Sequence, residues 1–266
     1  MALLLFFCAG PAGANGLALD GNLIQGGLTL GTAPPGTQLR LNDRIVRVAE
    51  DGAFVFGFGR EAPEYSTLHV RYPDGTVETR QLEVKSRKYE TQRINGLPSR
   101  MVTPSEEALK RIRRENSWIS DVRRLDTDRP YYRTGFVWPA IGPVSGVYGS
   151  QRILNGEPRR PHYGLDIAAG RGAPVFSPAD GVIALAKKDL YFTGGTVMID
   201  HGYGITSVMS HLESVSVVVG QSVRQGDVIG TVGATGRATG PHLDWRVNWF
   251  EIRLDPALLL PNMPPR

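Results

Sequence analysis

Residues 17–88 alternate short β-prone runs with turn signals. The runs Leu39–Leu41 and Leu68–Tyr72 place apolar residues at every second position, as half-buried strands do. Two further runs lie at Ile45–Val48 and Ala53–Phe56. Turn signals separate the runs, at Pro34-Pro35-Gly36, Asn42-Asp43, Asp51-Gly52 and Pro73-Asp74-Gly75. Short strands at this spacing predict a small antiparallel β-sandwich, in which His69 has a structural or surface position.

Residues 89–135 change to a helical pattern. The run Thr103-Pro104-Ser105-Glu106 is a capping box with Pro at the first helical position. Apolar residues then recur at helical spacing, at Leu109, Ile112, Ile119, Val122 and Leu125. The pattern predicts a helix of about 20 residues that connects two β regions.

This predicted connector is also the basic part of the chain. Residues 80–133 hold 14 Lys and Arg against 8 Asp and Glu, whereas the whole chain has a formal net charge of only +4. A solvated, charged linker explains the pattern, and so does a surface that meets an anionic polymer such as the cell wall. Aromatic residues are not interleaved with a dense basic run, so nucleic acid is not favoured as the partner.

Residues 136–258 return to β-prone runs between Gly-rich turns. The runs predicted as strands are Val182–Ala186, Thr196–Ile199, Ile205–Met209, Val228–Val232 and Leu243–Val247. Helix-length periodicity does not separate them, so an antiparallel sheet is expected, followed by a short tail at 259–266. The 32 Gly and 19 Pro of the 266 residues also argue against a helical bundle. The fold class expected for the whole chain is therefore mainly β with one helical connector.

The N-terminus has the composition of an export signal. An apolar stretch from Ala2 to Ala9 precedes Ala12-Gly13-Ala14, a small-x-small pattern typical of signal peptidase sites. We therefore expect residues 1–14 to be a signal peptide and the protein to be exported to the periplasm or cell envelope. Cleavage there removes Cys8, the only cysteine, which suits an oxidising compartment. A membrane-spanning segment is not expected, because no later stretch is long and apolar enough.

Four of the five histidines fall in the C-terminal β region, and two have an aspartate close by. His162 stands four residues before Asp166, at the entry to a predicted strand. His242 and Asp244 are two apart in a β-prone run, so both side chains point to one face of the strand. His211 closes another predicted strand. Imidazoles and carboxylates in this number could hold a zinc ion and still leave a free base.

These motifs resemble the lysostaphin/LytM family of zinc metallopeptidases across residues 138–248. The resemblance rests on blocks that occur in the family's order, including Tyr148-Gly149-x-x-Arg152, His162-x-x-x-Asp166, Gly172-x-Pro174-Val175, Ala179-Asp180-Gly181-Val182, Asp200-His201-Gly202-x-Gly204, Met209-Ser210-His211-Leu212 and Gly233-x-Thr235-Gly236-x-x-Thr239-Gly240-Pro241-His242-Leu243. It implies a two-layer antiparallel β-sheet domain and cleavage of peptide cross-links in bacterial peptidoglycan.

The resemblance also implies a role for each site residue. His162 and Asp166 match two zinc ligands, and His211 and His242 match the catalytic histidines. The family's third ligand is the second histidine of a His-x-His motif, and here that position holds Asp244. We therefore expect one zinc ion per chain, bound by His162, Asp166 and Asp244. His201 is expected to be structural.

Three functions remain open. The first is an active zinc endopeptidase acting on peptidoglycan. The second is a catalytically inactive LytM-like factor that binds cell wall or activates another wall hydrolase. In the third, the metal is structural and the protein is an envelope scaffold.

Overall fold

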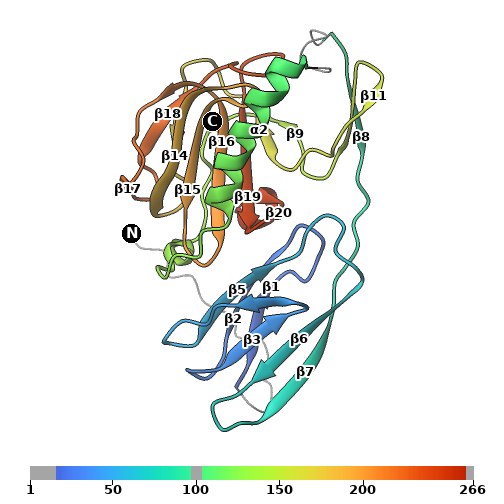
Figure 1. The fold of residues 1–266 in the computed structure, drawn as a ribbon, viewed down its shortest axis with the longest axis vertical. Coiled ribbons are helices and arrows are strands. Elements are labelled where there is room, and N and C mark those ends of the chain that lie inside the picture. The colour runs from blue at the N-terminus through green and yellow to red at the C-terminus, as the bar shows by residue number, and fades with distance from the viewer. Residues whose placement is uncertain (1–15, 97–103, 262–266) are drawn as a thin grey trace. The chain divides into compact units, whose positions relative to one another are not determined.

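The computed structural model describes residues 16–96 and 104–261, which form two compact units that divide between Arg87 and Lys88 (Figure 1). The described residues form many strands and one α-helix, so the expected fold class, mainly β with a helical connector, is confirmed. The expected signal peptide lies outside the described residues. Within the described ranges, no helix combines the length and the apolar character needed to cross a bilayer.

The first unit contains two antiparallel sheets. One has three strands, in the order β1 (Ala18–Gly21), β2 (Leu28–Thr32) and β5 (Ala53–Gly57). The other has four, in the order β4 (Arg44–Val46), β3 (Gln38–Leu41), β6 (Tyr65–Arg71) and β7 (Val77–Glu83). On β6 the alternation expected from the sequence is visible, because Ser66, Leu68 and Val70 are buried while His69 lies on the other face, near Thr79.

The second unit is built on one large antiparallel sheet. Its main path contains seven strands, in the order β17 (Ser222–Val223), β14 (Gly181–Leu190), β15 (Gly194–Asp200), β16 (Ile205–Val215), β19 (Leu243–Trp249), β12 (Leu165–Ile167) and β9 (Val144–Gly146). Three more strands pair beside this path: β13 (Pro174–Phe176), β18 (Val228–Val232) and β20 (Ile252–Leu254). The antiparallel sheet predicted for this region is therefore confirmed.

A smaller sheet brings the start of the predicted connector into the second unit. Strand β8 (Thr91–Ile94) pairs in parallel with β10 (Gln151–Leu154), which in turn pairs with β11 (Glu157–Pro158). Two short 3₁₀ helices, η1 (Tyr131–Thr134) and η2 (Pro256–Leu259), complete the unit. Residues 89–135 therefore pack as part of the second unit.

The predicted helix is α2 (Glu106–Arg123), and it lies across the large sheet (Figure 1). Val122 packs with Leu185, Met198 and Val208 in a buried cluster on one face of the sheet. The N-cap differs from the expectation. Ser105 Oγ accepts a hydrogen bond from the Ala108 amide, so the cap lies two residues beyond Thr103, which is outside the described residues.

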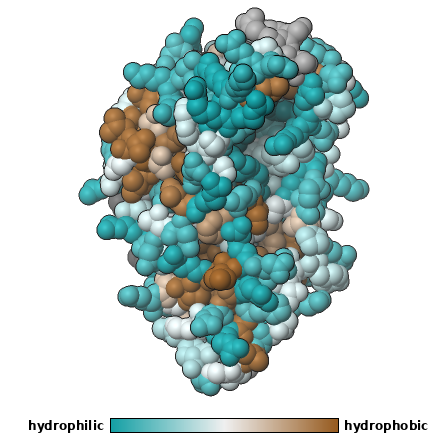
Figure 2. Space-filling view, in the orientation of Figure 1, coloured by the Kyte–Doolittle hydropathy of each residue, from teal (hydrophilic) through white to brown (hydrophobic). Residues whose placement is uncertain are grey.

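One basic side chain of α2 forms ion pairs within the second unit. Arg111 pairs with Glu115 on the helix and with Asp189 at the end of β14, while Glu115 accepts a hydrogen bond from the Tyr191 amide. Arg113 and Arg114 are exposed, and the surface over α2 is mostly hydrophilic (Figure 2). Intramolecular ion pairs therefore fix one edge of the helix, and its outer face remains basic.

Candidate metal centre

Asp166 and Asp244 meet because their strands are neighbours in the sheet. Asp166 on β12 is paired in register with Asp244 on β19, and side chains directly opposite each other share one face of an antiparallel sheet. His162 lies in the loop before β12. Its backbone exchanges hydrogen bonds with two residues near β10, because its amide bonds Ser150 O and its carbonyl accepts from Gly149 N. The loop and the strand pairing thus bring the three side chains together.

The three side chains form a compact buried cluster. His162 Nε2 lies 3.3 Å from Asp166 Oδ1 and 4.0 Å from Asp244 Oδ1. One ligand atom from each residue lies within 4.8 Å of the others. All three residues are buried, with exposed fractions of 2%, 6% and 1%. An imidazole and two carboxylates at this spacing could hold a metal ion.

Unpartnered atoms in the cluster support this interpretation. Both ring nitrogens of His162 and the Oδ1 atom of Asp166 are buried without a hydrogen-bond partner among the described residues. A buried polar atom without a partner costs on the order of 1–3 kcal/mol. A divalent cation would satisfy His162 Nε2 and Asp166 Oδ1 together. The donor set, one nitrogen and two carboxylate oxygens, is one that zinc accepts, so the residues present fit a zinc ion.

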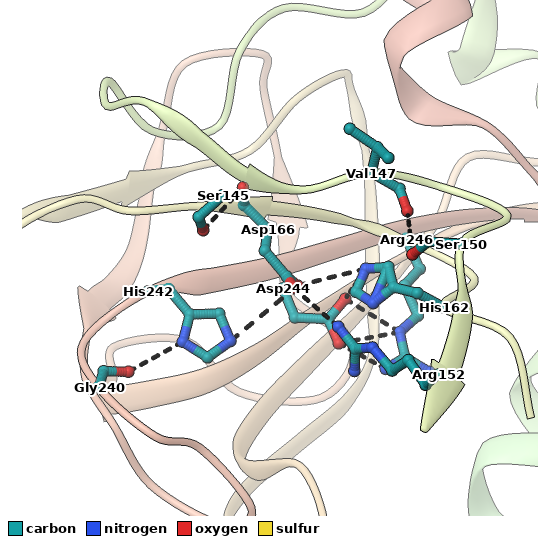
Figure 3. Close-up of polar contacts among 10 residues, drawn as sticks. All are labelled: Ser145, Val147, Ser150, Arg152, His162, Asp166, Gly240, His242, Asp244 and Arg246. Atoms are coloured by element: carbon teal, nitrogen blue, oxygen red, sulfur yellow. Dashed lines mark hydrogen bonds and ion pairs between the residues drawn. The ribbon is translucent and has the colours of Figure 1, made fainter. Parts of the chain in front are cut away.

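Two arginines hold the two carboxylates (Figure 3). Arg152 Nη2 donates to Asp166 Oδ2 at 2.8 Å. Arg246 Nε donates to Asp244 Oδ1 at 3.0 Å and to Oδ2 at 3.2 Å, and Arg246 Nη2 also donates to Oδ2. Each carboxylate still has its Oδ1 atom turned towards His162.

Burial and charge set the protonation of the cluster. Burial lowers the pKa of His162 to about 3, which keeps the imidazole neutral and able to bind a metal. Burial and the charge of Asp244 raise the pKa of Asp166 to about 6. Burial also acts to raise the pKa of Asp244, but the charge and hydrogen bonds of Arg246 outweigh it and hold that pKa below its usual range. Asp244 is therefore ionised at neutral pH.

Two further histidines lie beside the cluster. The rings of His211 and His242 have centroids 4.7 Å apart, and His242 Nε2 lies 4.0 Å from Asp166 Oδ1. His211 Nδ1 bonds Thr235 O at 2.8 Å, and His242 Nδ1 bonds Gly240 O at 2.9 Å. Because a carbonyl oxygen only accepts, Nδ1 carries the hydrogen in both rings and Nε2 is the remaining nitrogen. Burial lowers the pKa of His211 to about 4, so its Nε2 is a proton acceptor at neutral pH.

A β-bulge turns His211 towards the cluster. Ser210 is paired with Asp244 and shares its face of the sheet, so strict alternation would place His211 on the opposite face. Between the Val197–Met209 and Gly195–Leu212 pairs, however, β16 has one residue more than β15. His211 is in the left-handed region with φ of 65°, an uncommon conformation outside glycine. The bulge thus places its ring against His242.

Gly164 has no Cβ atom, and this leaves room for the Asp244 side chain. A Cβ atom on Gly164 would lie 2.5 Å from Asp244 Oδ1, 2.7 Å from Arg246 Cγ and 2.8 Å from Trp245 O. Even alanine would therefore displace the carboxylate or the strand.

His201 lies outside the cluster. It is fully buried, with Nδ1 bonded to Asp180 O at 2.6 Å and Nε2 bonded to Ser207 Oγ at 2.8 Å. Burial lowers its pKa to about 4. Both ring nitrogens are thus occupied, and the expected structural role agrees with these contacts.

Additional positive charge surrounds the cluster. Arg237 follows β18, and its guanidinium lies over the Phe192 ring, 4.3 Å from the centroid. Burial and the charges of Arg152, Arg246 and Arg159 lower the pKa of Arg237 to about 10. Arg237 therefore lies within electrostatic range of Arg159 and of Arg152 and Arg246, the two arginines that pair with the aspartates.

All five site residues predicted from the sequence come together in the structure. The sequence reasoning missed Arg246 and the close approach at Gly164, and it quoted Arg152 without assigning it a role. A signal for Arg246 was present, because it stands two residues after Asp244 and so shares its face of the strand.

Two curated relatives match the C-terminal half of the chain. The cell division protein DipM of Caulobacter vibrioides is 36% identical over 133 residues, and the peptidoglycan DD-endopeptidase ShyB of Vibrio cholerae is 41% identical over 134 residues. These matches cover 48% and 50% of this chain. They span only 21% and 29% of the relatives' own lengths, so the chain is similar to one part of each.

A solved structure matches over nearly the whole chain. It is a Pseudomonas aeruginosa protein assigned to peptidase M23, 32% identical, with a TM-score of 0.70. The match covers 90% of this chain and 95% of that one. The model of peptidase family M23 itself matches residues 160–256, which contain the three cluster residues and both neighbouring histidines. The motif-based resemblance is thus confirmed by a relative of similar length, and the chain belongs to peptidase family M23.

Proposed function

We propose that this protein is exported to the cell envelope, where it acts as a zinc-dependent endopeptidase that cleaves peptide cross-links of bacterial peptidoglycan. The observation that carries the proposal is the unpartnered pair of His162 Nε2 and Asp166 Oδ1, 3.3 Å apart and facing Asp244. Two histidines with Nε2 available stand beside this pair.

His162, Asp166 and Asp244 would hold one zinc ion. When bound, zinc supplies a Lewis acid that polarises a peptide carbonyl and acidifies water. The protein contributes a dry, preorganised cluster, because the ligand atoms are buried and the arginines already hold the carboxylates.

His211 and His242 would move the proton. His211 is neutral and presents Nε2, so it can accept a proton from the attacking water. His242 holds its ring by Nδ1 and places Nε2 beside Asp166, where it can assist the transfer to the leaving amine. Groups that act in this way typically contribute about 10²–10⁴-fold to the rate.

The charge around the site suits a substrate with carboxylates. Arg152, Arg159 and Arg246 act electrostatically on Arg237, and Arg152 and Arg246 also act on Asp166 in the cluster. Peptidoglycan peptides carry carboxylates, and local positive charge raises the concentration of such a substrate near the site. The name of the similar Vibrio cholerae protein, a peptidoglycan endopeptidase, supports the same substrate.

One observation favours a second function. Arg246 donates to both oxygens of Asp244, so the guanidinium can by itself balance the charge of this buried carboxylate. A protein with this arrangement could be an inactive relative that binds cell wall or activates another wall hydrolase.

Digestion of purified sacculi separates the two functions. We expect full-length protein purified without chelator to contain one zinc per chain and to release peptide-cleaved fragments, detected by mass spectrometry. Chelator treatment should stop the release, and added zinc should restore it. Metal content that stays well below one per chain after zinc is added, together with binding to sacculi, would support the inactive factor.

A further inference from the structure

Arg246 and Asp244 form one unit on the site face of β19. They are two residues apart on β19, and on the neighbouring strand β16 Val208 pairs with Arg246 and Ser210 pairs with Asp244. Val208 belongs to the cluster that packs beneath α2, so the guanidinium side of the unit is backed by packed structure. Gly164 closes it from the β12 side, because a Cβ there would strike both Asp244 Oδ1 and Arg246 Cγ. The carboxylate is therefore held in one orientation.

The two carboxylate oxygens of Asp244 differ in their hydrogen bonds. Oδ2 of Asp244 receives hydrogen bonds from both Nε and Nη2 of Arg246, whereas Oδ1 receives one and lies 4.0 Å from His162 Nε2. In Asp166 the difference between the two oxygens is larger. Its Oδ2 accepts from Arg152, and its Oδ1 has no hydrogen-bond partner among the described residues and lies 3.3 Å from His162 Nε2. On both strands an arginine holds Oδ2. At Asp166 the arginine leaves Oδ1 without a hydrogen bond, whereas at Asp244 the Arg246 Nε also donates to Oδ1, which still faces His162.

We propose that Arg246 is a positioning residue that enables Asp244 to serve as the third metal ligand. The inference rests on the proposed function, because it requires a metal at the His162–Asp166–Asp244 cluster. Aspartate is shorter than histidine, so a ligand at this position depends on a fixed orientation of its carboxylate. Arg246 supplies that orientation because it donates to both oxygens, with Nε and Nη2 on Oδ2 and Nε also on Oδ1.

The pairing of Arg246 with Asp244 also affects the net charge of the proposed metal centre. Two aspartates and one histidine make a zinc centre formally neutral, whereas two histidines and one aspartate leave it at +1. Arg246 adds a positive charge directly behind Asp244. The pair thus occupies the ligand position without adding net negative charge to the centre.

Zinc affinity tests the inference directly. We would measure the zinc dissociation constant of the full-length protein by competition with a chromophoric chelator, and record the visible spectrum of the Co²⁺-loaded form as a probe of ligand geometry. Arg246→Met should weaken zinc binding by about 10–100-fold, the usual effect of removing a hydrogen bond to a metal ligand, and should change the Co²⁺ spectrum. Arg246→Lys keeps the positive charge but cannot donate from two nitrogens in a fixed geometry. Its zinc affinity should therefore fall by less than that of Arg246→Met.

The decisive comparison uses Asp244→His. A histidine ligand does not need a guanidinium to orient it, so adding Arg246→Met to Asp244→His should change zinc affinity by less than about threefold. Arg253→Met is the matched control. Arg253 is a neighbouring half-buried arginine that hydrogen-bonds Asn248 instead of a carboxylate, and its loss should leave zinc affinity unchanged.

Each outcome has a distinct meaning. Zinc binding by Arg246→Met that equals or exceeds that of the wild type would overturn the inference and leave the proposed function intact. An equal loss in the wild-type background and in the Asp244→His background would also overturn it, because the effect would then be general. Failure of the wild type to bind zinc would overturn the proposed function together with this inference. If Arg246→Met does not fold, Arg246→Lys in both backgrounds provides the comparison.

Discussion

His211 and His242 face each other with ring centroids 4.7 Å apart, and each donates its Nδ1 hydrogen to a backbone carbonyl. The two carbonyls belong to Thr235 and Gly240, which lie in the loop between β18 and β19. This loop therefore fixes both rings, and Nε2 is in each case the nitrogen that does not bond to these carbonyls. Neither ring belongs to the group of three side chains that could hold a metal, so the proposed function gives proton transfer and metal binding to different residues.

Replacing either histidine should separate these two roles. We expect His211→Ala and His242→Ala to retain one zinc per chain while turnover on sacculi falls by about 10²–10⁴-fold, the usual effect of losing acid–base assistance. Zinc is measured by elemental analysis, and turnover by the rate of fragment release. A variant that loses its zinc would show that the replaced histidine is a ligand.

The conformation of His211 predicts an unusual order of stability. Glycine in a strand is normally less stable than alanine by about 0.5–1 kcal/mol. At φ of 65° the order should reverse, because the left-handed conformation costs a residue with a Cβ roughly 1–2 kcal/mol. His211→Gly should therefore be more stable than His211→Ala by about 1 kcal/mol in urea unfolding. Both variants lack the imidazole ring, so they form a matched pair. If His211→Ala is instead the more stable variant, the bulge has relaxed out of the left-handed conformation.

The strands that the sequence predicted best are those whose apolar positions are dense. The long runs of β14, β15, β16 and β19 carry enough apolar residues to stand out from the turns. Strand β7 was missed because most of its residues are exposed or half-exposed and polar, so it lacks a clear buried face. The helix was predicted from its period, but its cap depended on a choice between Thr103 and Ser105 that only backbone geometry decides.

The site residues were predicted from their motifs and from the family resemblance, and their arrangement was predicted only in part. Period-two alternation correctly places Asp244 on a shared face, and the same rule predicts the wrong face for His211, because a bulge cannot be recognised from Ser210-His211-Leu212 alone. The same alternation places Arg246 beside Asp244, but their hydrogen bonds depend on side-chain conformations that the spacing does not specify. The close approach at Gly164 depends on β19, which is distant in sequence.

Gly164 should contribute to metal binding although it provides no ligand. In Gly164→Ala the new Cβ would press on Asp244 Oδ1 and on the Trp245 carbonyl, and overpacking of this kind costs about 1–3 kcal/mol. We expect lower stability and weaker zinc binding. Gly170→Ala is the control, because a Cβ there would meet nothing within 4 Å. Unchanged zinc affinity in Gly164→Ala would show that the Asp244 carboxylate tolerates displacement.

Acid should destabilise the second unit through His201. The pKa of this histidine is 6.5 in the unfolded chain and about 4 in the folded protein, where burial keeps the ring neutral. Below pH 6.5 the unfolded state binds a proton that the folded state does not, so the free energy of unfolding falls as pH drops towards 4. The contribution of His201 is therefore fully present above pH 6.5, and about 2 kcal/mol of it is lost at pH 5.

His201→Gln isolates this contribution. The variant should be less stable at pH 7.5, because it loses the fitted ring between Asp180 and Ser207, and its stability should fall less steeply between pH 6.5 and 4 than that of the wild type. All four tryptophans, at positions 118, 138, 245 and 249, lie in the second unit, so their fluorescence in urea follows that unit alone. Subtracting the two curves at each pH cancels the other titrating groups. A constant difference from pH 7.5 to 4 would show that His201 takes up a proton equally in both states, and would contradict a neutral, buried ring.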